Sequence, residues 1–150
     1  MKTQKYRALN RLAALFKNAN DAVIVQDIQG KIMAWNNEAG KMYGYTESKA
    51  LMMNISQIVP LKEQKKLTES FEWIEKGNNL KTCETQRITK KGKILDIRLI
   101  AICIFDRSGK IGPILTIEKD ITKIKDLQGN TEVEVKILKD YCLSVHHAKK

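Results

Sequence analysis

The residues ILDIRLIAICIF, from Ile94 to Phe105, constrain the fold of this chain more than any other stretch. Every second residue from Leu95 onward is apolar, and a period of two places these side chains on one face of a β-strand. The positions between them are polar at Asp96 and Arg98 and then become isoleucines. The first half therefore predicts a strand with one buried face, and the second half a strand that is apolar on both faces.

Shorter stretches elsewhere have the same strand-like character, and turns join them in pairs. AVIVQD (22–27) and KIMAW (31–35) flank a turn at Gly30, and KTCETQRIT (81–89) meets the long strand across the turn KKGK. After DRSGK comes the last stretch, IGPILTIEKDIT (111–122), in which a proline suits the strand's start or a bulge. Because short joins favour antiparallel pairing, the sequence predicts a five-stranded antiparallel sheet.

In two other regions, the apolar residues recur at the spacing of an α-helix. Residues 3–17 place apolar side chains three and four positions apart, which predicts an amphipathic helix, and the same spacing within residues 62–76 predicts a second helix. Between the strand pairs, Asn36 and Asn37 are suited to begin a helix near Glu38, Gly44 to end it, and Thr46 to begin the next short helix. The order of two strands, several helices and three strands indicates an α+β domain over residues 20–122. Residues 1–19 and 123–150 flank this domain.

The net charge of +10 does not by itself indicate nucleic-acid binding. Residues 1–19 carry five basic and no acidic groups, whereas residues 20–122 carry sixteen basic and thirteen acidic groups. A nucleic-acid-binding domain usually concentrates its charge on one recognition element. Because the central domain is nearly balanced in charge, we do not expect nucleic acid as a partner.

The sequence lacks the features of several other classes of protein. No apolar run reaches the length of roughly 20 residues that a bilayer span needs. Three widely spaced cysteines suit a reducing cytoplasm better than a disulfide framework. Both histidines lie in the tail, where Cys142, His146 and His147 form a weak metal motif without a fourth ligand. With no phosphate-binding loop and no candidate base in the central domain, we expect no catalytic residues and no metal site.

Three motifs in this order resemble a PAS domain, the small sensor module of bacterial signalling proteins. They are NANDAVIVQDIQGKIMAWNNEAGKMYGYT, TKKGKILDIRL and TIEKDIT. The resemblance covers residues 20–122 and implies the PAS fold, with helices on one face of the sheet. It also implies a ligand pocket between the sheet and the central helices. The residues that we expect to line this pocket are Ile24, Met42, Ile58, Leu67, Phe71, Cys83, Leu99, Ala101 and Ile117. The alternative is that these side chains simply fill a close-packed core.

The cofactor of such a pocket is unknown from the sequence, but two cofactors are disfavoured. Haem-binding members carry an axial histidine at the place that Leu67 occupies here. Photoactive flavin-binding members carry Gly-x-Asn-Cys where this chain has Met52, Met53, Asn54 and Ile55, so the adduct-forming thiol is absent. Redox flavin-binding members carry a tryptophan near the position of Lys81. Cys83 could be a redox thiol, although a buried cysteine commonly packs as a small hydrophobe.

The flanks predict how such a domain would signal. In PAS proteins a leading helix commonly packs on a sheet and forms a homodimer, which would involve Leu9, Leu12, Ala13 and Phe16. The domain ends in Asp120, Ile121 and Thr122, through which the family passes its signal to a helical tail. We expect a cytoplasmic, non-enzymatic sensor of a two-component system, either cut from a longer histidine kinase or acting alone by association. The alternatives are a ligand-free dimerisation module and a redox or haem sensor with Met or Cys donors.

Overall fold

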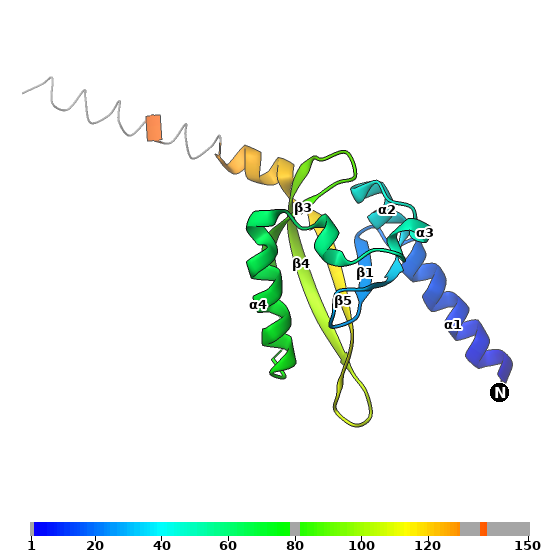
Figure 1. Ribbon diagram of the computed structural model, residues 1–150. Coiled ribbons are helices and arrows are strands. Elements are labelled where there is room, and N and C mark those ends of the chain that lie inside the picture. Colours follow the sequence, from blue (N-terminus) through cyan, green and yellow to red (C-terminus); the bar gives the residue numbers. More distant parts are fainter. Residues whose placement is uncertain (1, 79–81, 130–135, 138–150) are drawn as a thin grey trace, which may run out of the picture. The chain divides into compact units, whose positions relative to one another are not determined.

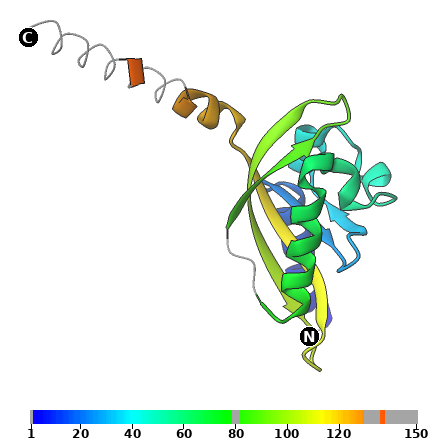
Figure 2. The same cartoon turned by 60° about the vertical axis from the view of Figure 1, so that its left-hand side comes forward.

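The structure is a computed structural model that describes residues 2–78, 82–129 and 136–137 of the chain (Figures 1 and 2). The chain divides into two compact units, Met1–Asp120 and Ile121–Lys150. The first unit contains the sheet and the helices that cover it. In the second unit, residues 122–129 are helical.

The first unit contains the elements that the sequence predicts, in the predicted order. Its strands are β1 (Ala22–Gln26), β2 (Ile32–Trp35), β3 (Cys83–Ile88), β4 (Ile94–Phe105) and β5 (Ile111–Asp120). Its helices are α1 (Lys2–Lys17), α2 (Asn37–Tyr43), α3 (Glu47–Ala50), α4 (Gln64–Glu75) and the 3-10 turns η1 (Ile55–Ile58) and η2 (Leu61–Glu63). The α+β fold with a five-stranded antiparallel sheet is confirmed.

The strand order in the sheet is β2-β1-β5-β4-β3, with every neighbouring pair antiparallel. The first and last strands of the chain therefore pair at the centre, where Ile24 lies opposite Thr116. Pro113 lies outside the pairing with β1 and next to an irregularity in the β4–β5 register. A proline is tolerated at such a place because no ladder hydrogen bond needs its missing N–H.

The two faces of the sheet differ in what covers them. The inner face packs against the helices, and α4 lies along it beside β3, β4 and β5 (Figures 1 and 2). On the outer face, Ile100, Ile102 and Ile104 remain 45%, 49% and 47% exposed. The even positions in the second half of β4 are apolar, as the sequence indicates, but the described residues leave this half of the outer face partly open to solvent.

The glycine- and asparagine-rich segment after β2 forms the predicted helix caps. The Asn36 side chain accepts a hydrogen bond from the backbone N–H of Ala39 at the start of α2, and Gly44 ends that helix with a left-handed φ of 84°. Thr46 caps α3 by accepting from the N–H of Lys49. These caps are confirmed, and they turn the chain so that α2 packs on β1.

The flanking segments are described only in part. In α1, Ala13 is exposed and Phe16 is half-buried, while the side chains of Leu9 and Leu12 lie outside the described residues. The motif Cys142, His146 and His147 also lies outside them. Within the described ranges, no helix has the length and apolar character that crossing a bilayer would require.

Candidate ligand cavity

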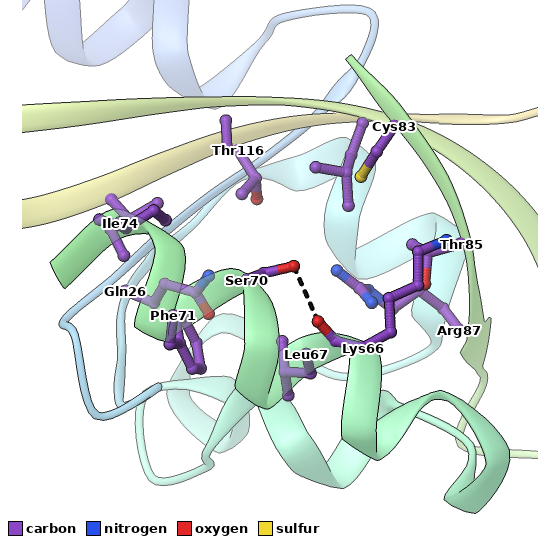
Figure 3. A pocket seen from close by; sticks show the side chains of 13 residues that line it. Gln26, Lys66, Leu67, Ser70, Phe71, Ile74, Cys83, Thr85, Arg87 and Thr116 are labelled. Carbon is purple, nitrogen blue, oxygen red and sulfur yellow. Dashed lines mark hydrogen bonds between the residues drawn. The ribbon is translucent and has the colours of Figure 1, made fainter. Parts of the chain in front are cut away.

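A small cavity lies between α4 and the inner face of the sheet (Figure 3). Its volume is about 40 Å³, which is enough for a few water molecules. The helix supplies one wall, and β1, β3, β4 and β5 supply the other. The lining residues are Gln26, Lys66, Leu67, Ser70, Phe71, Ile74, Cys83, Thr85, Arg87, Leu99, Ala101, Ile114 and Thr116.

The structure brings some of the expected pocket residues together and separates others. Those that line the cavity are Leu67, Phe71, Cys83, Leu99 and Ala101. Ile24 and Ile58 are fully buried in the core beside it, and Met42 packs against that core. Ile117 lies on the outer face, opposite Ile100, because the alternation of β5 points its even-numbered residues inward.

The sequence analysis missed most of the polar wall. Gln26, Ser70, Thr85, Arg87 and Thr116 all line the cavity. The signal that could have found one of them is the period of two, because residues two apart on a strand share a face. That alternation would have predicted Gln26 two residues after the inward-facing Ile24. On β5 it would have failed, because the sequence analysis took Ile117 as inward-facing, whereas the buried positions are Ile114, Thr116 and Glu118.

A buried ion pair forms one end of the polar wall. Arg87 Nε donates to Glu118 Oε1 at 2.9 Å, and the two side chains are only 4% and 0% exposed. Burial lowers the pKa of Arg87, but the charge and hydrogen bond of Glu118, together with Tyr43 and Cys83, outweigh this effect, and the pKa is raised. Thr116 Oγ1 donates to the other carboxylate oxygen at 3.4 Å. Burial, and then the charge of Glu118, also raise the pKa of the Tyr43 hydroxyl.

Gln26 forms a second polar feature of the wall. Its side chain is 3% exposed, and no described residue donates a hydrogen bond to its Oε1 atom. Figure 3 shows this amide pointing into the space between Ser70, Phe71 and Thr116. A buried acceptor without a donor costs free energy in the folded state, so its retention needs a reason.

The candidate redox thiol, Cys83, lies in the cavity wall opposite α4. Burial raises its pKa, more strongly than the nearby Lys66 lowers it. Because the thiolate is the reactive form of cysteine, this environment reduces the reactivity of Cys83 at neutral pH.

At the positions where related sensors bind cofactors, this chain has residues with other structural roles. Leu67 projects an aliphatic side chain into the cavity at the position of the axial haem ligand. Asn54 caps η1, and Ile55 is fully buried in the core. Lys81 lies outside the described residues. Sites for drug-sized ligands occupy roughly 300–1,000 Å³, so a flavin or a haem would require this cavity to open considerably.

The fold and the cavity can now be compared with known proteins. A family model described as "PAS domain" matches residues 20–123. The chain therefore belongs to the PAS domain family, whose members are sensor modules and are generally not catalytic.

Solved structures agree with this assignment. The PAS domain of a protein from Colwellia psychrerythraea is 26% identical with a TM-score of 0.71, and the match covers 77% of this chain and 98% of that one. A domain of a sensory box sensor histidine kinase/response regulator from Geobacter sulfurreducens is 25% identical with a TM-score of 0.63, covering 77% and 96%. The PAS domain of an HTR-like protein from Haloarcula marismortui shares the fold at 21% identity and a TM-score of 0.66, covering 80% and 97%. No curated protein matches the chain. Together these findings define a sensory signalling module.

Proposed function

We propose that this PAS domain senses a small molecule in the cavity between α4 and the sheet, and that it signals to a histidine kinase or another output domain. The observation that carries the proposal is the cavity itself, because it combines an apolar wall with a buried, incompletely satisfied polar wall. Such a combination is typical of ligand sites and not of a close-packed core.

The proposed signal leaves through β5. Thr116 and Glu118 belong to the polar wall and its ion pair, and the same strand ends at Asp120. The chain then continues directly through Ile121 and Thr122 into the helix of residues 122–129. A ligand that changes the contacts of Thr116 or Arg87 would change the end of the strand that leads to this helix. Asp120, Ile121 and Thr122 are therefore the proposed relay.

The ligand-binding proposal is tested on the purified full chain by native mass spectrometry together with an absorption spectrum. We expect a colourless protein with a small bound mass that is lost on denaturation. A Soret or flavin band would contradict the colourless sensor and support the haem or redox alternative. A protein that gains no mass from a broad metabolite library, and whose melting temperature no metabolite changes, would contradict ligand sensing.

A second candidate function, a homodimerisation module, is favoured by the outer face of the sheet. In the register of β4 and β5, Ile100 lies opposite Ile117 and Ile102 opposite Leu115, which makes a continuous apolar surface without charges. Exposed apolar surfaces of this kind mark protein interfaces. We propose a second copy as the occupant, because an uncharged apolar patch complements an identical patch across a two-fold axis. The α1 residues Leu9, Leu12, Ala13 and Phe16 are proposed to extend this interface.

Replacing Ile102 with lysine is expected to weaken the homodimer at least tenfold, because a two-fold interface would bury both unpaired lysines. Sedimentation velocity over a concentration series measures this effect. The matched control is Leu61→Lys, since Leu61 is 92% exposed on η2, away from the sheet. Removal of residues 1–19 tests the arm separately. A monomeric wild-type chain, or an Ile102→Lys variant that dimerises as well as Leu61→Lys, would contradict the proposed interface.

A further inference from the structure

The unpaired acceptor in the cavity indicates what kind of molecule the cavity binds. We infer that the ligand is a small neutral molecule with an apolar body and a hydroxyl or primary amide head, and that this head donates a hydrogen bond to Gln26 Oε1. The inference rests on the proposed sensing function and specifies the ligand class of the same site. It starts from the fact that this oxygen is buried and receives no hydrogen bond from any described residue.

The opposite walls of the cavity require an apolar body. Leu67, Phe71 and Ile74 of α4 face Leu99, Ala101 and Ile114 of the sheet across the space. These side chains cannot hydrogen-bond, so a polar body would lose its hydration without compensation. An alkyl chain replaces water there at no such cost. The volume of about 40 Å³ limits the body to a short chain unless the walls move.

The charges near the cavity favour a neutral head. The Arg87 guanidinium is already paired with the fully buried Glu118 carboxylate at 2.9 Å. A ligand carboxylate could pair with Lys66, which also lines the cavity, but it has no proton to donate to Gln26 Oε1. A ligand ammonium would instead approach the Arg87 cation. An ammonium head therefore meets the Lys66 and Arg87 cations, and a carboxylate head leaves Gln26 Oε1 without a donor, whereas a neutral head with an N–H or O–H avoids both.

A hydroxyl or a primary amide satisfies both polar groups of the wall. Its N–H or O–H donates to Gln26 Oε1, and its oxygen can accept from Arg87. Of the five N–H donors on a guanidinium, Nε–H binds Glu118 and one Nη1–H makes a long contact of 3.5 Å to the Gln86 carbonyl. No described residue is recorded as an acceptor for the other Arg87 donors, so they are left for a ligand oxygen. Ser70 Oγ donates to the Lys66 carbonyl, as Figure 3 shows, so that its oxygen is also left as an acceptor.

The first experiment is an NMR titration of the full chain, ¹⁵N-labelled, with 1-propanol, propionamide and sodium propionate as probes. We expect the two neutral probes to shift the Gln26 side-chain amide and the backbone amides of Ile114 and Thr116 with saturable, millimolar affinity. Propionate, which has a similar size, should bind at least tenfold more weakly. Tighter binding of propionate would overturn the neutral class while supporting a ligand site. If none of the three probes gave saturable shifts, the inference would be overturned, and the mass-spectrometry test above would decide the proposed function separately.

The second experiment uses Gln26→Met, which keeps the length of the side chain and removes its amide. We expect the affinity for 1-propanol to fall about five- to tenfold, the effect of one lost hydrogen bond. Since an unpaired buried acceptor disappears, the melting temperature should stay the same or rise by about 3 °C. The control is Gln29→Met in the exposed turn before β2, which should change neither quantity. A lower melting temperature would show that Gln26 is structural, and unchanged affinity would show that it does not bind the head; either result overturns the inference.

Discussion

Replacing Glu118 with glutamine is expected to lower the free energy of unfolding by about 3–5 kcal/mol. The substitution preserves the shape of the side chain but removes the charge that compensates Arg87, which is only 4% exposed and 2.9 Å away. An unpaired guanidinium would then be buried against the cavity, and neither solvent nor another described carboxylate replaces its partner. Urea unfolding followed by circular dichroism measures the change.

Two further variants separate the ion pair from the general effect of losing a charge. Glu69→Gln breaks the exposed Lys65–Glu69 pair on α4 and should change stability by less than about 0.5 kcal/mol. The double variant Arg87→Met/Glu118→Leu removes both buried charges and should recover most of the loss. If Glu118→Gln were as mild as Glu69→Gln, the pair would not be buried in solution as the structure describes.

Replacing Asn36 with alanine is expected to lower the free energy of unfolding by about 3 kcal/mol. Asn36 is 1% exposed, and its Oδ1 atom accepts hydrogen bonds from the N–H groups of Val23 at 2.9 Å and Ala39 at 3.0 Å. Its Nδ2 atom donates to the carbonyl of Asp21 at 2.9 Å. Alanine would leave these three backbone groups unsatisfied, and each costs about 1 kcal/mol or more when buried.

The neighbouring asparagine is the matched control. Asn37 is exposed, and its side chain makes only a 3.4 Å contact to Asn18. Thermal and urea unfolding of Asn37→Ala should therefore stay within about 0.5 kcal/mol of the wild type. Similarly small losses for the two variants would mean that the helix cap at Asn36 contributes little. In that case its bonds to β1 and to Asp21 would contribute little.

Most of the secondary structure could be predicted because it depends on local patterns. The alternation in Ile94–Phe105 predicts β4 with the bounds that the structure has, and the caps at Asn36, Gly44 and Thr46 follow from backbone requirements within a few residues. The turns between strands favoured antiparallel pairing for the same reason. The family resemblance then supplied the fold that joins these elements.

The cavity was predicted only in its apolar part. Leu67, Phe71 and Leu99 could be expected there because apolar side chains with the right period face inward. Arg87 and Glu118 could not, since a charged residue in a strand ordinarily indicates a solvent-exposed position. They become a buried pair only because β3 and β5 both border β4, which places residues 31 positions apart within 2.9 Å of each other.

The sequence by itself therefore determined the elements, their caps and the class of the domain, because each depends on neighbouring residues and on the period of their side chains. Only the tertiary structure decided the strand order, the cavity and its polar wall. The pairing of β1 with β5 joins the two ends of the domain and brings Gln26 beside Ile114 in the sheet. No local pattern encodes that proximity, since it depends on contacts between residues far apart in the chain. Among the described residues, the same contacts leave Gln26 Oε1 without a donor and so make Gln26 the residue by which we expect the ligand to be recognised.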